Sequence, residues 1–255
     1  MIKVALTIAG SDPSGGAGLQ ADVKVFTVFG VYGMAVPAAL TVQNTQGVEA
    51  VKAVPPAFLQ RQLDVLLSDI SVDAVKTGML MNARTIEIVA SALRKHGVKN
   101  LVVDPVMVSS SGRRLLKKNA VEALVKELLP MADLVTPNAD EAGVLAGMEV
   151  ETYEDAEEAA RRIHALGPRF VLIKGGHLGG DAVDFFYNGV EVFRYPGRRI
   201  QNKKLHGAGC VFSAAITAGL AKEMSVMEAI AVAKRFVTGA IKKAAPVGKG
   251  RTPLV

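Results

Sequence analysis

The chain has 255 residues, of which 50% are hydrophobic and 21% are charged, and its formal net charge is +6. This composition is typical of a compact protein with a large core, and it excludes disordered and fibrous proteins. No apolar run is long enough to span a bilayer and the N-terminus lacks the features of a signal peptide, so we expect a single cytoplasmic domain over residues 1–255.

Short apolar or β-branched runs alternate along the chain with longer segments of helical period. Strands are predicted at residues 3–9, 35–42, 74–77, 101–104, 134–136 and 170–174. Helices are predicted at residues 17–29, 56–68, 82–96, 117–129, 138–146 and 153–166. This alternation indicates an α/β fold with a parallel sheet and crossover helices.

The last third of the chain has a different pattern. Asn188 and Gly189 lie between apolar and aromatic runs in residues 183–195, which is the strongest short-range signal for an antiparallel hairpin. Two long helices are predicted after it, at residues 210–221 and 226–244. We therefore expect two antiparallel strands at one edge of the sheet.

A glycine-rich segment, residues 10–18, joins the first predicted strand to the first helix. Ligands of open parallel sheets bind at the carboxyl ends of the strands, where such turns lie. The segment does not have the spacing of a dinucleotide-binding fingerprint, and the chain lacks a phosphate-binding loop with Gly-x4-Gly-Lys-Ser/Thr. Both of those nucleotide-binding modes are disfavoured.

A second glycine-rich segment, residues 205–210, opens a long apolar helix. The Gly207-Ala208-Gly209 amides at a helix start could bind a phosphate or an oxyanion. Cys210 lies in the first turn, where we expect the pKa of a thiol to fall, although a lone cysteine can also be a packing residue. His206 is close enough in sequence to suggest a Cys/His pair, but the spacing does not guarantee contact.

Polar residues also follow three other predicted strands. Asn138 and Glu141 could form a helix cap or hold Mg²⁺, and Asp104 could face the same space. Lys174 follows a strand as either a phosphate ligand or a solvated side chain. Together with the two glycine-rich segments, these residues describe a phosphoryl-transfer site.

The net positive charge is concentrated in five basic doublets. We expect solvated surfaces rather than a nucleic-acid site, because aromatic residues make up only 5% of the chain and tryptophan is absent. An anionic substrate stays possible. Cys210 is the only cysteine, which excludes an intrachain disulfide and a cysteine-rich zinc site. The doublets are Arg113/Arg114, Lys117/Lys118, Arg198/Arg199, Lys203/Lys204 and Lys242/Lys243.

With these motifs in place, the chain resembles the ribokinase-like superfamily and, within it, the hydroxymethylpyrimidine/phosphomethylpyrimidine kinases of thiamine biosynthesis. The match is specific when the motifs are taken together, because they extend over nearly the whole chain. The matching segments are residues 6–18, 43–45, 77–80, 104–107, 136–141, 174–177, 206–210 and 247–250.

The resemblance implies a three-layer α/β/α fold with a mostly parallel sheet, in a protein that is usually a homodimer. It implies that ATP and Mg²⁺ are used to phosphorylate 4-amino-5-hydroxymethyl-2-methylpyrimidine and then to convert the monophosphate into the diphosphate. Two alternatives remain: a pyridoxal or pyridoxine kinase of the same superfamily, and a non-catalytic ligand-sensing module.

The resemblance also implies roles for individual residues on the acceptor side of the site. Gln43 would bind the amino group and ring nitrogen of the pyrimidine, and Gly10, Asp22, Met79 and Val106 would line the pocket. Gln43 presents both a hydrogen-bond donor and an acceptor, which suits that edge of the ring.

On the nucleotide side, Lys174 and Asn138 would bind ATP, and Glu141 and Asp104 would serve the magnesium. The segment from Gly207 through Ala208 and Gly209 to Cys210 would form the anion hole, with Cys210 as the general base and Asp22 as the next candidate. Ala208 departs from the family, whose members typically have threonine at this position, so a hydroxyl contact to phosphate is lost.

Overall fold

The computed structural model describes residues 2–109, 112, 115, 116, 118–200 and 204–255. Its main sheet has nine strands in the order β3-β2-β1-β4-β5-β6-β7-β8-β9. The strands are β1 (Val4–Ser11), β2 (Tyr32–Asn44), β3 (Gly47–Ala53), β4 (Ala74–Thr77), β5 (Leu101–Val103), β6 (Leu134–Val135), β7 (Phe170–Ile173), β8 (Asp184–Tyr187) and β9 (Val192–Tyr195).

The centre of the sheet is parallel and both of its edges are antiparallel. Strands β2, β1, β4, β5, β6 and β7 pair in parallel, while β8 and β9 form the predicted edge hairpin. Strand β3, which pairs antiparallel with β2 at the other edge, was not predicted. The Asn44 side chain accepts hydrogen bonds from the amides of Gln46 and Gly47, so this turn is built by a side chain and lacks the Asn-Gly signal.

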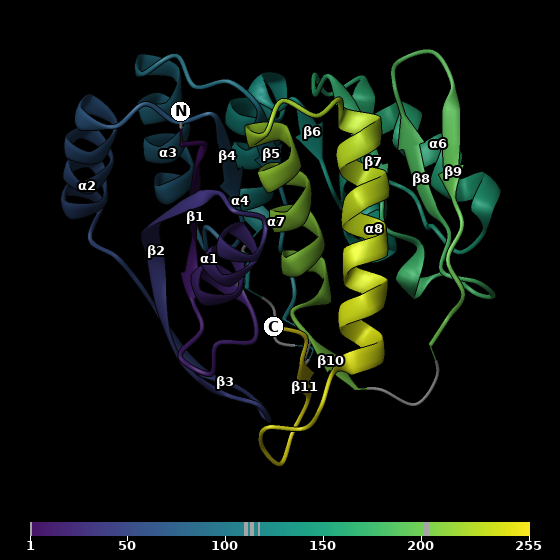
Figure 1. The fold of residues 1–255 in the computed structure, drawn as a ribbon. Helices are drawn as coiled ribbons and strands as arrows, with labels where there is room; N and C mark the ends of the chain where they lie inside the picture. The colour runs from purple at the N-terminus through teal and green to yellow at the C-terminus, as the bar shows by residue number, and fades with distance from the viewer. Residues whose placement is uncertain (1, 110–111, 113–114, 117, 201–203) are drawn as a thin grey trace.

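Helices cover both faces of the sheet, which confirms the predicted three-layer α/β/α architecture (Figure 1). One face carries α1 (Gly18–Val28), α7 (Ala208–Ala221) and α8 (Val226–Lys243). The other face carries α2 (Pro56–Asp69), α3 (Ala83–Lys95), α4 (Lys118–Ala123), α5 (Ala139–Ala146) and α6 (Tyr153–His164). Each face has its own hydrophobic core.

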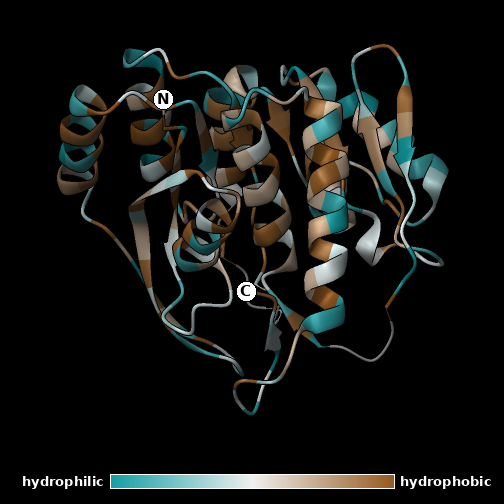
Figure 2. Ribbon diagram, in the orientation of Figure 1, coloured by the Kyte–Doolittle hydropathy of each residue, from teal (hydrophilic) through white to brown (hydrophobic). Residues whose placement is uncertain are grey.

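Several helices differ in detail from their predicted bounds. The predicted helix at residues 117–129 is α4 followed by a π-helical turn (Leu124–Leu128) and a 3-10 turn (Leu129–Met131), and residue 117 lies outside the described residues. Helix α7 is buried along nearly its whole length, whereas α2 and α8 alternate hydrophobic and hydrophilic residues (Figure 2). The amphipathic helices are therefore the outer ones, and α7 is a core helix.

The parallel strands share a pattern on the face that packs against α1, α7 and α8. Each strand places an apolar residue on that face, followed two positions later by a polar residue, which in β4 to β7 lies at or next to the carboxyl end of the strand. Because side chains alternate between the faces of a sheet, these polar groups point toward α7. The apolar residues are Ala5, Ala74, Val102, Leu134 and Leu172, and the polar residues are Thr7, Lys76, Asp104, Thr136 and Lys174.

A short second sheet closes the carboxyl end of the main one. Strand β10 (Leu205–His206) pairs in parallel with β11 (Thr252–Pro253). Lys24 on α1 donates a hydrogen bond to the carbonyl oxygen of Val255, so the chain end is attached to the first helix. The last residues of the chain thereby lie beside the glycine-rich segment that follows β1 (Figure 1).

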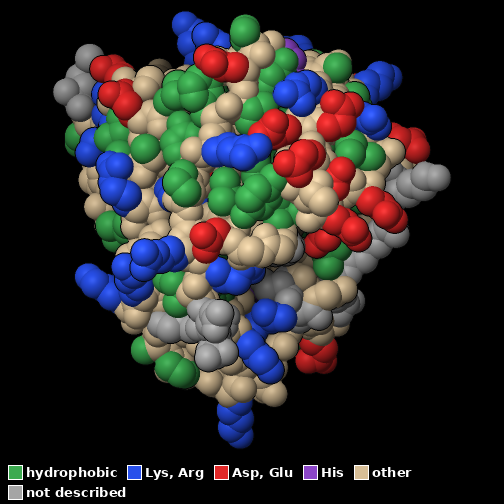
Figure 3. Space-filling view, turned by 90° about the vertical axis from the view of Figure 1, so that its right-hand side faces the viewer, with side chains coloured by type: hydrophobic (Ala, Val, Ile, Leu, Met, Phe, Trp, Pro, Cys, Tyr) green, Lys and Arg blue, Asp and Glu red, His purple; other side chains and the backbone are tan. Residues whose placement is uncertain are grey.

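Neither sign of charge dominates the face of the molecule around the β8–β9 edge, where basic, acidic and hydrophobic side chains all occur (Figure 3). Arg194 on β9 donates to Glu157 there. Arg199 belongs to a doublet that was expected to be simply solvated, but its guanidinium donates to the carbonyl oxygens of Gly176 and Gly180.

Among the described helices, none is long and apolar enough to cross a membrane. Of the basic doublets, Arg113, Arg114, Lys117 and Lys203 lie outside the described residues.

Candidate active site

A cavity of about 760 Å³ lies at the carboxyl ends of the parallel strands. This volume is within the range of small-molecule sites, roughly 300 to 1,000 Å³. The cavity brings together almost every residue that the sequence predicts for the site. It is lined by Gly10, Gln43, Met79, Asp104, Val106, Asn138, Glu141, Lys174, Gly207, Ala208, Gly209 and Cys210.

The start of α7 forms one wall of the cavity. Gly207 precedes the helix with a φ of 78°, in the left-handed region, and a Cβ at this position would overlap the carbonyl oxygen of Gly16. Only glycine therefore lets the helix begin against the first glycine-rich segment. Gly209 lies next to Lys174, because a Cβ at Gly209 would be 3.2 Å from Lys174 Nζ. The free amides of the helix start and a lysine ammonium thus face the same space, which suits an anion.

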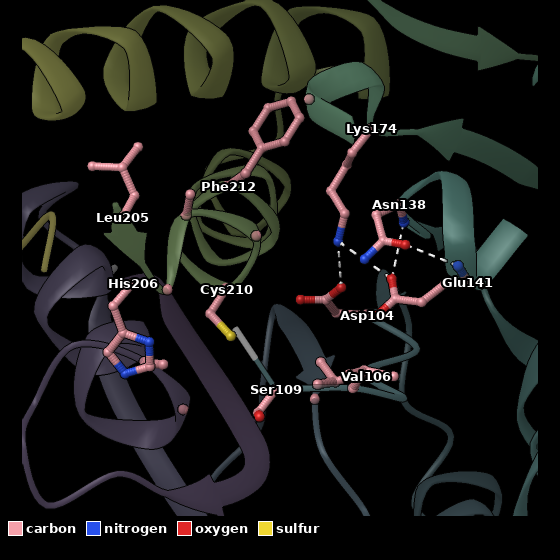
Figure 4. Close-up of a pocket in the computed structure, with 18 of the residues that line it drawn as sticks. Asp104, Val106, Ser109, Asn138, Glu141, Lys174, Leu205, His206, Cys210 and Phe212 are labelled. Atoms are coloured by element: carbon pink, nitrogen blue, oxygen red, sulfur yellow. Dashed lines mark hydrogen bonds and ion pairs between the residues drawn. The ribbon is translucent and has the colours of Figure 1, made fainter. Parts of the chain in front are cut away.

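Lys174 is the centre of a charged cluster beside the start of α7. Its Nζ lies 2.8 Å from Asp104 Oδ1 and 3.9 Å from Glu141 Oε2 (Figure 4). The other oxygen of Asp104 accepts a hydrogen bond of 2.9 Å from Ser213 on α7. Lys174 is therefore not a solvated side chain but a cation held between two carboxylates.

Burial and the charges within this cluster shift the pKa values of its members. Burial opposes ionisation of Asp104, but the ammonium groups of Lys174 and Lys76 outweigh it and hold the pKa of that carboxyl below its usual range. Burial likewise opposes the charge on Lys174, whereas Asp104 and Glu141 raise its pKa above the ordinary value. For Glu141 burial dominates and the pKa is raised. At neutral pH the lysine is charged and Asp104 is its ionised partner.

Asn138 and Glu141 form the helix cap that their spacing predicts. Asn138 Oδ1 accepts a hydrogen bond from the backbone amide of Glu141, and Glu141 Oε2 accepts one from the backbone amide of Asn138. Glu141 also approaches Lys174 and lines the cavity, so capping and a place in the site are compatible. Asn138 accordingly has its side-chain oxygen engaged by the helix.

Cys210 lies in the first turn of α7 and is partly exposed to the cavity. The expectation of a lowered thiol pKa is wrong, because burial raises the pKa of Cys210 to about 11. Lys76 opposes this rise, and Asp104 adds to it. The helix start acts locally on the thiol, but the neighbouring carboxylates and the loss of water outweigh it. Cys210 is consequently a protonated thiol at neutral pH.

Asp22 is the one predicted site residue that does not line the cavity. Its side chain is fully buried on α1, where Oδ2 accepts hydrogen bonds from Thr7 at 2.6 Å and from Lys76 at 2.8 Å. An ion-paired carboxylate below the cavity does not reach a substrate, so this placement does not support Asp22 as a base. Sequence reasoning missed Lys76, whose signal is a lysine inside a strand that is buried along its whole length.

Gln43 on β2 lines the cavity next to Thr41 and His206. Gln43 Oε1 lies 3.2 Å from Thr41 Oγ1, and Gln43 Nε2 lies 3.1 Å from His206 Nε2. That ring nitrogen is also 2.7 Å from Oδ2 of the buried Asp12. His206 Nε2 therefore contacts Gln43 and Asp12.

Comparisons with known proteins agree with this geometry. The phosphomethylpyrimidine kinase family model matches residues 12–255. The chain is 50% identical over 250 residues to the thiamine biosynthesis bifunctional protein ThiED of Geobacter sulfurreducens, covering 98% of this chain but only 51% of that protein. It is 47% identical over 260 residues to the hydroxymethylpyrimidine/phosphomethylpyrimidine kinase of Rhizobium meliloti, covering 100% of this chain and 97% of that one.

The fold also matches a solved kinase structure. The ADP complex of Bacillus subtilis pyridoxal kinase superposes with a TM-score of 0.91 at 41% identity, covering 99% of this chain and 96% of that one. The predicted resemblance is thus confirmed over the full length of the chain. This chain belongs to the phosphomethylpyrimidine kinase family.

Proposed function

We propose that this chain, acting as one kinase domain over residues 1–255, uses ATP to phosphorylate 4-amino-5-hydroxymethyl-2-methylpyrimidine and then its monophosphate, in thiamine biosynthesis. One observation carries the proposal. A single cavity contains both the start of α7, whose amides suit an anion, and the Gln43 side-chain amide, which can hydrogen-bond to the polar edge of a pyrimidine. The full-length identity to the Rhizobium kinase supports the same substrate class.

The phosphates of ATP would lie against Lys174 and the amides of Gly207 to Cys210. Lys174 supplies a point charge, and the amides supply hydrogen bonds that strengthen as charge develops on the transferred phosphoryl group. A side chain at Gly209 would crowd Lys174 Nζ, so the glycine keeps this approach open. The loss of a threonine hydroxyl at Ala208 leaves these backbone donors in place.

Magnesium fits the residues on this side of the site. Asp104 and Glu141 are two carboxylates that line the cavity beside Lys174, and Mg²⁺ is commonly held by one or two carboxylates with waters and substrate phosphates. The ion would neutralise charge on the phosphates. Lys174 would then neutralise the carboxylate charge of Asp104 or Glu141 that the ion does not neutralise.

The two acceptors make different demands on Cys210. The hydroxymethyl group must lose a proton when it attacks the phosphoryl group, and the thiolate form of Cys210, a minor fraction at neutral pH, could take that proton in the cavity. The monophosphate is already anionic near neutral pH, since its second pKa is about 6, and needs only stabilisation of charge. One cavity can therefore serve both steps, with Cys210 needed mainly in the first.

Gln43→Leu tests the assignment of the acceptor end. Because the aminopyrimidine edge would lose its polar partners, the KM for the pyrimidine alcohol should rise by the equivalent of about 1 to 3 kcal/mol. The KM for ATP should not change, since Lys174 and the start of α7 are untouched. Steady-state kinetics with each substrate varied in turn provide the measurement, and an unchanged KM for the pyrimidine would show that Gln43 does not read it.

Pyridoxal phosphorylation is the second candidate function, favoured by the TM-score of 0.91 with Bacillus subtilis pyridoxal kinase. Both substrates are flat heteroaromatic rings with a hydroxymethyl arm. We expect kcat/KM for the pyrimidine alcohol and its monophosphate to exceed kcat/KM for pyridoxal, measured by ADP release with the three acceptors in parallel. A preference for pyridoxal would reverse the assignment, and no ADP release with any of them would favour the ligand-sensing alternative.

Two further proposals concern the protein as a whole. A homodimer is supported by apolar side chains that are exposed on the β2–β3 hairpin, where Leu40 is 53% and Val42 is 57% accessible. These side chains share one face of β2 and would be covered by a second copy. Sedimentation of the purified protein at several concentrations tests this. A cytoplasmic location stays a prediction.

A further inference from the structure

A buried ion pair lies beneath the cavity and has no part in the mechanism above. Lys76 Nζ is 2.8 Å from Asp22 Oδ2, and both side chains are 0% exposed. Thr7 donates to the same carboxylate oxygen, and Asp22 Oδ1 is buried without a hydrogen-bond partner. Such pairs rarely add stability, because desolvation offsets their attraction. The pair therefore calls for a reason other than holding the fold together.

The position of Lys76 directs its charge toward the start of α7. Lys76 shares the α7 face of the sheet with Ala74, because the two residues are two positions apart on β4, and it lines the floor of the cavity with Cys210. Asp22 is the one hydrogen-bond acceptor that the described residues provide for its ammonium, which has three donors. The charge of Lys76 is thus only partly satisfied by its partner.

The groups that interact electrostatically with the Cys210 thiol come from four elements. Helix α1 provides Asp22 and the Gly18 amide, and β4 provides Lys76. Asp104 follows β5 and Lys174 follows β7, where the two are paired with each other. Lys76 is the group that most favours a negative charge on the sulfur, whereas Asp104 and Asp22 oppose it. Because the Lys76 and Asp22 side chains are fully buried, the interactions of their charges are weakly screened.

We propose that Lys76 is a positioning residue for phosphoryl transfer, whose buried ammonium, held in place by Asp22 and Thr7, stabilises the thiolate of Cys210. Its link to catalysis rests on the proposed function, but its effect on the thiol does not. Lys76 acts through Cys210, so it should matter in the step that takes a proton from the alcohol and matter less when the monophosphate is the acceptor.

The single cysteine of the chain allows a direct test without substrates. The rate of alkylation of Cys210 by iodoacetamide, followed by mass spectrometry between pH 7.5 and 9.5, reports the thiolate. Lys76→Met should slow alkylation about threefold for each unit by which the thiol pKa rises, since the lower thiolate fraction is partly offset by greater nucleophilicity. Loosened packing would expose the sulfur and speed the reaction, so slowing cannot come from a structural defect.

Two further variants keep the test decisive. The double variant Lys76→Met with Asp22→Asn leaves no buried charge unpaired, so it should fold even where the single variant does not. It should also be slowed, but by less than the single variant, because Asp22, which opposes the thiolate, is removed together with Lys76. Thr7→Val disturbs the same cluster without changing a charge, and its rate should stay within about twofold of wild type. Unchanged or faster alkylation in both Lys76 variants would overturn the proposal.

Kinetics then separate this inference from the proposed function. If the chain phosphorylates the pyrimidine alcohol, the double variant should lose more activity with the alcohol than with the monophosphate, and the pH dependence of the alcohol step should move to higher pH. Slower alkylation in a protein without pyrimidine kinase activity would refute the function while leaving the role of Lys76 toward the thiol intact. Equal kinetic losses with both acceptors would refute the positioning role.

Discussion

Replacing Cys210 with alanine is expected to slow phosphorylation of the pyrimidine alcohol by about 10²- to 10⁴-fold, the range typical for loss of a general base. Phosphorylation of the monophosphate should be spared much more. The reason is that only the alcohol has to lose a proton, whereas in the proposed mechanism both steps use the amides at the start of α7 and the charge of Lys174. The rates of the two steps, measured separately with each acceptor, provide the comparison.

The raised thiol pKa adds a pH signature to this prediction. With a pKa of about 11 for Cys210, the thiolate fraction increases about tenfold for each pH unit between 7 and 9. The alcohol step of the wild type should therefore accelerate relative to the monophosphate step as the pH rises, and Cys210→Ala should abolish that difference. Equal losses in both steps, with no change in the pH dependence, would mean that Cys210 contributes only packing or the shape of the anion site.

Lys174→Ala is expected to lower kcat/KM for ATP by about 10²- to 10³-fold, as for loss of one preorganised group that stabilises the transition state. The loss should be the same with the alcohol and with the monophosphate, because the proposed role of Lys174 is toward the nucleotide and not toward the acceptor. The variant also leaves Asp104 and Glu141 without their cation, so its thermal stability should be measured in parallel.

Lys95→Ala is a matched control for Lys174→Ala. Lys95 also forms a 2.8 Å ion pair, with Asp64, but on the exposed surface of α3, and it does not line the cavity. Its removal should leave both steps unchanged, because exposed ion pairs contribute little. A defect of Lys174→Ala that appears with one acceptor only would contradict the assignment of this lysine to the nucleotide.

Much of the fold could be predicted because local signals agree with the tertiary structure. The alternation of strands and helices, the Asn188-Gly189 turn and the capping pair Asn138 and Glu141 each act within a few residues. The strand ends that carry Asp104 and Lys174 meet because parallel strands place their carboxyl ends at one edge of the sheet. The predicted members of the site, apart from Asp22, line one cavity for this reason.

What sequence reasoning missed depends on contacts between distant segments. Strand β3 is joined to β2 by a turn whose hydrogen bonds come from the Asn44 side chain, which carries no strong pattern. The pairing of Asp22 with Lys76 joins α1 to β4, and no spacing in the sequence indicates it. The pKa of Cys210 follows from burial and from carboxylates on other elements, so the local rule for a helix start gave the wrong direction.

The central claim is that one cavity performs two successive phosphorylations, and following the products tests it most directly. Purified protein with excess ATP and magnesium should convert 4-amino-5-hydroxymethyl-2-methylpyrimidine first into the monophosphate and then into the diphosphate, as resolved by ³¹P NMR over time. Each conversion should consume one equivalent of ATP. Accumulation of the monophosphate without any diphosphate, or no phosphorylated pyrimidine under conditions in which pyridoxal is phosphorylated, would contradict it.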